Sequence, residues 1–339
     1  MPIRGPYARW IRNWETRLAR RDAERVVRPF EWGWEWLGLD GAGGASGTRM
    51  REWNRAVLSD TDVFFAYRRP EDYRFQDGHL TFSSPLASPY PENNLVHADF
   101  FSARERRRAV VVLPQWNADA TGHVRLCRLL NRFGICALRL SLPYHDRRMP
   151  PELERADYHV SSNLGRTIHA CRQSTIDTRA CLDWLEAQGY RRLGVLGTSL
   201  GAAMAFIAAA HDPRVRAGVY NLFGMYFGDV IWTGLPTRHV RRGLDGHVTQ
   251  DELREYWMVI SPPVYVPRFA GRDTMSLFIR ARYDSAFLPE FALQFLALCR
   301  AYQIPHRVRV LPCGHYTTGE FPFKWLDALP MCRFLARRL

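Results

Sequence analysis

The chain has 339 residues, of which 47% are hydrophobic, which is enough to bury a large core in one or two domains. Its formal net charge is +13, yet its 47 basic residues are spread along the whole chain, and all except Lys324 are arginines. No uncharged apolar run reaches the ~18–20 residues that span a membrane. No motif of a nucleic-acid-reading domain accompanies the positive charge. Composition therefore argues against a membrane-spanning protein and against a dedicated nucleic-acid-binding protein.

Seven cysteines are scattered through the chain without a C-x-x-C pair, and several lie in apolar runs. This pattern is typical of reduced core thiols rather than of a disulfide framework. The arginine-rich N-terminus lacks the apolar stretch of a secretory signal, so we expect a cytoplasmic protein. Zinc-site spacings such as C-x-x-C and H-E-x-x-H are absent, and the sequence predicts no metal and no cofactor.

Near the N-terminus, aromatic and aliphatic residues recur at helical spacing among arginines, and this predicts a helix over residues 7–28. Its Trp10 and Trp14 allow two interpretations. The helix packs its tryptophans on the main domain, which we favour, or it makes peripheral contact with an anionic membrane. The glycine-rich residues 40–47 are predicted to be a connector. We therefore expect an N-terminal helical extension over 1–57 and a main domain over 58–339.

In the main domain, short apolar runs alternate with helical patterns. Residues 73–101 are expected to form antiparallel strands. Later strands are predicted at 109–113, 135–140, 193–198, 215–223, 275–281 and 308–311, and helices at 120–133, 166–188, 202–210 and 288–301, with a further helix ending the chain. This order predicts an α/β protein with a mostly parallel, doubly wound sheet that has helices on both faces. Residues 224–272 break the alternation and predict a small cap or lid.

The stretch Gly197-Thr198-Ser199-Leu200-Gly201 joins an apolar run to an alanine-rich helical pattern. A sharp strand-to-helix turn of this kind raises a serine hydroxyl above the edge of the sheet. Asp284 and His315 follow two later predicted strands. Because the carboxyl ends of parallel strands share one edge of a sheet, we expect Ser199, Asp284 and His315 to converge.

With these motifs, residues 75–339 resemble the α/β-hydrolase superfamily, whose nucleophile, acid and histidine occur in this chain order. The resemblance implies that Ser199 is a nucleophile, that His315 is its general base, and that Asp284 orients the imidazole. Asp273 and Asp229 also compete for the role of the acid. Asp273 precedes its strand, however, and Asp229 follows an earlier one, so Asp284 is preferred.

An oxyanion hole needs two donors. The resemblance implies that one is the backbone N–H of Leu200 and that the other comes from the loop after residues 109–113. This loop reads Leu-Pro-Gln-Trp and departs from the His-Gly pattern that is common in the superfamily. Both Trp116 and Gln115 are therefore candidates. His145, Tyr226 and Trp232 are further candidates for contact with substrate.

We interpret the chain as a serine hydrolase that cleaves a small carboxylic ester or thioester through an acyl-enzyme. Compact-pocket members of the superfamily, such as dienelactone hydrolases and acetyl-xylan esterases, are somewhat more similar than large lipases. An acyltransferase or peptidase on the same scaffold stays open, because the triad does not choose the acceptor. A membrane-surface acyl-lipid hydrolase and a non-catalytic binding module stay open as well. The sequence makes no prediction of oligomeric state.

Overall fold

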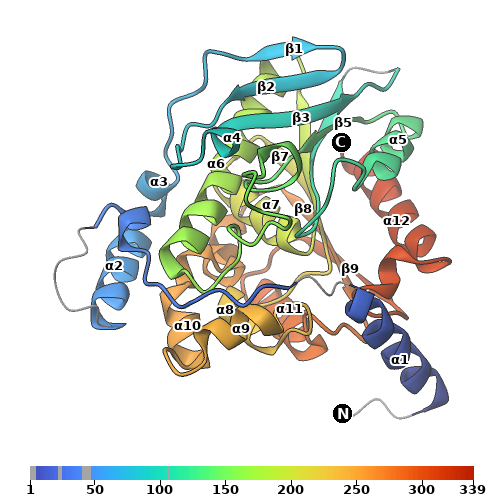
Figure 1. Ribbon diagram of the computed structural model, residues 1–339. Helices are drawn as coiled ribbons and strands as arrows, with labels where there is room; N and C mark the ends of the chain where they lie inside the picture. The colour runs from blue at the N-terminus through green and yellow to red at the C-terminus, as the bar shows by residue number, and fades with distance from the viewer. Residues whose placement is uncertain (1–4, 22–24, 40–46, 105–106) are drawn as a thin grey trace.

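The computed structural model describes residues 5–21, 25–39, 47–104 and 107–339. In this part of the chain, one nine-stranded sheet has the order β1-β2-β3-β5-β4-β6-β7-β8-β9 (Figure 1). Strands β1 to β3 and the β3–β5 pair are antiparallel, and all the pairs from β5 to β9 are parallel. The strands are β1 (Arg74–Gln76), β2 (His79–Ser83), β3 (Leu95–Phe101), β4 (Arg108–Leu113), β5 (Cys136–Leu140), β6 (Arg192–Thr198), β7 (Val215–Asn221), β8 (Met275–Ala281) and β9 (His306–Leu311). The predicted fold class is confirmed.

Helices cover both faces of this sheet, and strand residues alternate between them. In β4, Val111 and Leu113 belong to one apolar cluster, while Val110 and Val112 belong to the other. The first cluster includes α6 (Leu164–Ala187), α7 (Leu200–Ala210) and α11 (Pro289–Ala301). The second includes α1 (Pro6–Arg21), α5 (Val124–Arg132) and α12 (Phe323–Arg338). Short pieces complete the connections: α4 (Pro91–Asn94), η2 (Asp146–Arg148) and η5 (Thr317–Gly319).

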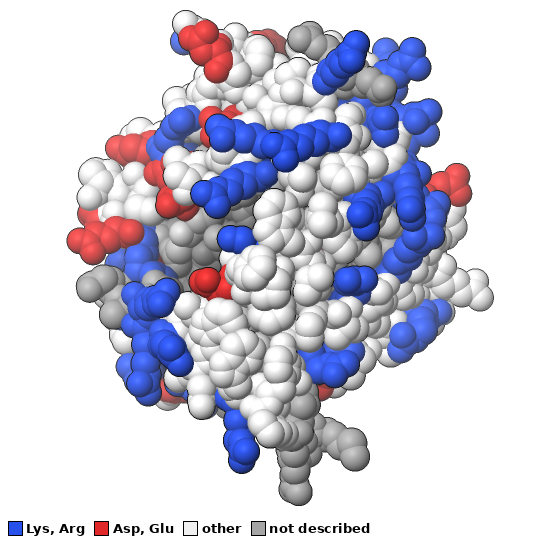
Figure 2. Space-filling model, turned by 90° about the vertical axis from the view of Figure 1, so that its right-hand side faces the viewer, with Lys and Arg blue, Asp and Glu red and all other residues white. Residues whose placement is uncertain are grey.

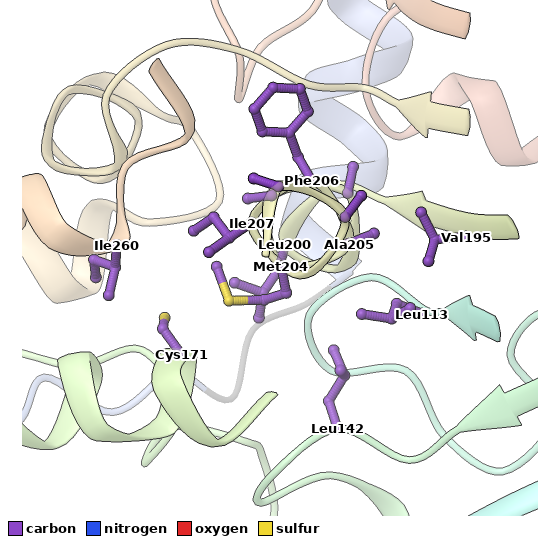
Figure 3. Packing of buried hydrophobic residues seen from close by; sticks show 14 of the residues in the cluster. Leu113, Leu142, Cys171, Val195, Leu200, Met204, Ala205, Phe206, Ile207 and Ile260 are labelled. Carbon is purple, nitrogen blue, oxygen red and sulfur yellow. The ribbon is translucent and has the colours of Figure 1, made fainter. Parts of the chain in front are cut away.

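Helix α7 is buried along its entire length. Its alanines give it a small cross-section, so its backbone lies close to the sheet. Figure 3 shows apolar side chains from four other elements around it. They come from β4 (Leu113), β6 (Val195), α6 (Cys171) and η3 (Ile260). This packing fixes the N-terminus of α7, where Ser199 lies.

The N-terminal helix is shorter than the sequence predicts. Helix α1 ends at Arg21, and residues 25–33 form a non-helical strap. The strap is held by backbone hydrogen bonds at the start of α6, from Leu164 to Glu31 (2.9 Å) and from Gly165 to Trp32 (3.0 Å). These tertiary bonds replace the helical ones that the periodicity favoured. The strap leads to η1 (Trp34–Leu37). Helices α2 (Gly47–Ser59) and α3 (Thr61–Phe64) follow along the chain. The predicted connector at residues 40–47 lies almost wholly outside the described residues.

The buried face of helix α1 that packs on the domain contains no tryptophan. Its buried residues are Ala8, Ile11, Glu15 and Leu18, whereas Trp10 is 51% exposed. Trp14 is half-buried, with its ring 6.2 Å from that of Phe323 in α12. The expected packing of the tryptophan stripe is therefore only partly correct.

The predicted cap is an insertion between β7 and β8. It consists of α8 (Phe227–Thr233), α9 (Arg238–Leu244), α10 (Gln250–Tyr256), η3 (Met258–Ile260) and η4 (Pro262–Phe269). Trp257 and Tyr265 are buried in the apolar cluster that also contains α6 and α7, and the Trp257 indole donates to the Leu164 carbonyl oxygen (3.2 Å). All seven cysteines are buried, and none of them forms a disulfide bond within the described residues. No helix among the described residues has the length and apolarity to cross a membrane.

Candidate active site

Ser199 lies in a strained turn between β6 and α7. Its backbone has φ 55° and ψ −119°, in a region that residues other than glycine rarely occupy. Two glycines make the turn possible. A Cβ on Gly197 would lie 2.2 Å from the Gly201 carbonyl oxygen, and one on Gly201 would lie 2.3 Å from the carbonyl oxygens of Leu113 and Pro114. The glycines of the motif therefore let strand, helix and the loop after β4 meet at the serine.

The structure brings Ser199, His315 and Asp284 together. The Ser199 Oγ lies 3.3 Å from His315 Nε2, and His315 Nδ1 lies 3.1 Å from Asp284 Oδ1. Asp284 follows β8 and His315 follows β9, as the strand pattern indicates. The same Asp284 oxygen accepts from the backbone N–H groups of Ala286 (2.9 Å) and Phe287 (2.8 Å). These bonds hold the carboxylate toward the imidazole.

Two nearby carboxylates set the direction in which the pKa of His315 moves. Burial lowers the pKa of its imidazole, but the charge and hydrogen bond of Asp284, together with the charge of Glu15, outweigh burial and raise that pKa above its usual value. An imidazole in this position can accept the Ser199 proton, because the nearby negative charges stabilise the imidazolium that forms.

The loop after β4 lies beside this triad. Gln115 and Trp116 line the same cavity as Ser199 and Leu200. The Trp116 indole N–H donates to the Ala156 carbonyl oxygen (2.9 Å), and its ring stacks on His239. Within the described part of the chain, the backbone N–H groups of Trp116 and Leu200 donate to no other group. Both therefore remain able to bind an oxyanion.

His145 supports this loop from behind and is absent from the cavity lining. Its Nε2 accepts from the backbone N–H of Asn117 (2.9 Å), and its Nδ1 donates to the Pro143 carbonyl oxygen (2.8 Å). Burial lowers the pKa of His145 to about 4, which keeps the ring neutral and its Nε2 an acceptor. Asn117 needs this support, because its φ is 60°. In the structure His145 therefore holds this loop and does not line the cavity, and its contact with substrate stays a prediction.

Ser199 and His315 line a cavity of about 1350 Å³. Apolar side chains of the cap and the β7 loop line one side of it. They are Phe223, Met225, Phe227, Val230 and Ile231. Tyr226 and Trp232 do not line this cavity. Their rings instead lie under the guanidinium groups of Arg254 and Arg241, and their contact with substrate stays a prediction.

The two competing acids are placed away from His315. Asp229 accepts hydrogen bonds from Arg254 (2.8 Å) and Gln250 (2.8 Å) within the cap. Asp273 is exposed just before β8. Only Asp284, among these candidates, contacts the imidazole. No group of three His, Cys, Asp or Glu residues in the described ranges is arranged to hold a metal ion.

A second buried carboxyl group lines the cavity and was not predicted from the sequence. Asp327 of α12 accepts a hydrogen bond from the Asn221 amide (2.8 Å), and the Asn221 carbonyl oxygen accepts from the Ser199 N–H (2.8 Å). Burial raises the pKa of Asp327 from 3.8 to about 8, although the bond from Asn221 lowers it. An aspartate on a helix gives no sequence signal of such burial.

This raised pKa predicts that stability falls as the pH rises. Between pH 4 and pH 8 the folded state keeps a proton on Asp327 that the unfolded state has released, so the free energy of unfolding decreases across that window. We expect Asp327→Asn to raise the melting temperature at pH 8 and to leave it nearly unchanged at pH 4. Thermal unfolding against pH measures this, with exposed Asp273→Asn as the control. Equal gains at both pH values would contradict it.

Comparisons with known proteins match the fold and one segment of the chain. Residues 99–222 match the family model described as "Alpha/beta hydrolase domain containing 18". An acetyl xylan esterase from Paenibacillus sp. R4 has a similar structure over 96% of this chain and 99% of its own, with a TM-score of 0.59 and 14% identity. An esterase from Pyrococcus furiosus matches over 81% of this chain and 95% of its own, with a TM-score of 0.53 and 14% identity.

A third similar structure is larger. The acylaminoacyl peptidase of Pyrococcus horikoshii matches over 82% of this chain with a TM-score of 0.58 and 13% identity, but the chain spans only 43% of that peptidase. The chain therefore has the fold of these α/β-hydrolase-like esterases, and its residues 99–222 match an alpha/beta-hydrolase family.

Proposed function

We propose that this protein is a serine hydrolase that cleaves carboxylic esters through an acyl-enzyme. The observation that carries the proposal is the Ser199–His315–Asp284 chain of contacts at the mouth of the cavity. His315 takes the Ser199 proton as the hydroxyl oxygen attacks the ester carbonyl, and then returns it to the leaving alcohol. Water, deprotonated by the same imidazole, then releases the acid and restores Ser199.

The tetrahedral intermediate requires donors for its oxyanion. We assign these to the backbone N–H groups of Leu200 and Trp116, because both border the cavity and neither has another acceptor among the described residues. The Leu200 N–H also lies at the N-terminus of α7, whose dipole favours negative charge. Gln115 stays a candidate through its side-chain amide.

The cavity supports acyl groups larger than acetyl. Its volume exceeds that of most drug-sized pockets, which are ~300–1,000 Å³, and one wall is apolar. We expect p-nitrophenyl esters of medium acyl chains to give a higher kcat/KM than the acetate. The corresponding p-nitroanilides test whether the enzyme acts as a peptidase instead. Failure to hydrolyse any ester of the series would overturn the proposal.

A second candidate is an acyl-lipid hydrolase that works at a membrane surface. Phe321 and Trp325 line the cavity and remain 71% and 49% exposed. Basic residues line the same cavity, and Figure 2 shows Lys and Arg side chains on the face that carries α5 and α12. Those on the cavity lining are Arg125, Arg128, Arg132, Arg155 and Lys324. Exposed aromatic and basic groups together favour an anionic lipid surface.

Vesicle flotation discriminates between the two candidates. The membrane candidate predicts that the protein floats with anionic vesicles and that Phe321→Ala/Trp325→Ala reduces the bound fraction several-fold. Equal recovery of both proteins with anionic and neutral vesicles would remove the membrane candidate and leave the ester hydrolase.

A further inference from the structure

A buried glutamate of the N-terminal helix contacts the two loops that carry the histidine and the acid of the site. Glu15 in α1 is only 2% exposed. Its Oε1 accepts from the backbone N–H of Thr317 (2.7 Å). Its Oε2 accepts from the backbone N–H of Tyr316 (3.1 Å) and from the Ser285 hydroxyl (2.8 Å). The carboxylate thus joins α1 to the residues next to both His315 and Asp284.

Steric contacts show how closely the histidine loop fits this carboxylate. A Cβ on Gly314 would lie 2.3 Å from the Glu15 carboxyl carbon, so a side chain at position 314 would displace this carboxylate. Two further hydrogen bonds hold the histidine loop on either side of Gly314. The Tyr7 hydroxyl donates to the Pro312 carbonyl oxygen, and the Arg25 guanidinium donates to the Tyr316 hydroxyl (2.9 Å).

We propose that Glu15 is a positioning residue of this active site: it fixes the His315 and Asp284 loops and adds a second negative charge beside the imidazole. This inference rests on the proposed function, since it assigns how His315 is held during ester hydrolysis. A buried charge on a helix would otherwise be costly, and three hydrogen bonds to these two loops offset that cost.

The charged and titratable groups around His315 define the expected pH effect. Asp284 and Glu15 are its negative neighbours. Tyr316 and Cys313 belong to the same loop, and the Arg25 guanidinium contacts this loop through the Tyr316 hydroxyl. Both carboxylates raise the pKa of His315. Because His315 acts as a base only when neutral, activity rises with pH through this pKa. Loss of the Glu15 charge therefore moves the acid limb of the profile to lower pH.

The test compares Glu15→Gln with Glu15→Asp in the full chain, and Arg17→Gln on the exposed side of α1 is the control. We expect Glu15→Gln to lower kcat on a p-nitrophenyl ester about ten-fold with little change in KM, and to shift the acid limb of kcat/KM down by about one pH unit. Glu15→Asp keeps the charge, so its acid limb should stay near that of the wild type even where kcat falls. Arg17→Gln should resemble the wild type.

A merely structural role makes a different prediction. If both Glu15 variants lower the melting temperature alike and leave the acid limb in place, the inference is wrong. If Glu15→Gln does not fold, Glu15→Asp still decides, because a displaced acid limb in that charge-retaining variant contradicts the role. An inactive wild-type enzyme would instead count against the proposed function.

Discussion

Replacement of Ser199 by alanine is expected to lower kcat/KM for p-nitrophenyl esters by at least about 10⁴-fold, because Ser199 supplies the hydroxyl that contacts His315. The residual rate comes from binding and from the oxyanion donors. The loss should appear in kcat, while KM changes little. Steady-state kinetics on the purified variant measure it, with Ser59→Ala on the exposed surface of α2 as the control.

The fold of this variant should be unaffected, because the substitution removes only one oxygen. The glycine neighbours that permit the strained backbone at position 199 are unchanged. The melting temperature therefore separates a chemical effect from unfolding. A folded Ser199→Ala enzyme that hydrolyses esters at the wild-type rate would mean that the hydrolysis takes place elsewhere.

Arg148→Ala is expected to produce the largest loss of stability. The side chains of Arg148 and Asp177 are both fully buried, and their nitrogen and oxygen atoms lie 2.8 Å apart. The guanidinium also donates to the carbonyl oxygens of Asn93 and Ser141. Removal of the arginine leaves Asp177 buried without its cation and two carbonyl oxygens without a donor. We expect the free energy of unfolding to fall by about 3–5 kcal/mol.

Urea denaturation measures this loss, and Arg147→Ala is the matched control because the Arg147 side chain is 46% exposed. Burial raises the pKa of Asp177 even beside Arg148, so adding Asp177→Asn should recover part of the stability by removing the unpaired charge. A change below about 1 kcal/mol in Arg148→Ala would show that this buried pair contributes no more than an exposed one.

The features that the sequence predicted are those with short-range causes. Glycines at positions 197 and 201 are required by contacts within one turn. Both are part of the strand-to-helix motif, so the motif itself predicts the turn. The placement of Asp284 and His315 after successive strands follows from the geometry of a parallel sheet, which makes their convergence a consequence of chain order. Continuous apolar runs in the strands likewise predict that both faces of the sheet are buried.

The features that the sequence did not predict depend on contacts between distant segments. Glu15 lies on the same buried face as Ile11 and Leu18, and a glutamate at that spacing was a signal that could have been noticed. Nothing local indicates that His145 supports Asn117 or that Asp327 reaches Asn221. Tyr226 and Trp232 suggested a pocket by composition alone, but composition does not say which face of a short helix meets the cavity.

The central claim is that Ser199 is activated by His315, which Asp284 orients. The most direct measurement is labelling of the folded protein with a fluorophosphonate, followed by mass-spectrometric location of the adduct. We predict a single adduct on Ser199 in the wild type and labelling that is at least about 10³-fold slower in folded His315→Ala. An adduct at another residue, or equal labelling rates in the two proteins, would contradict the claim.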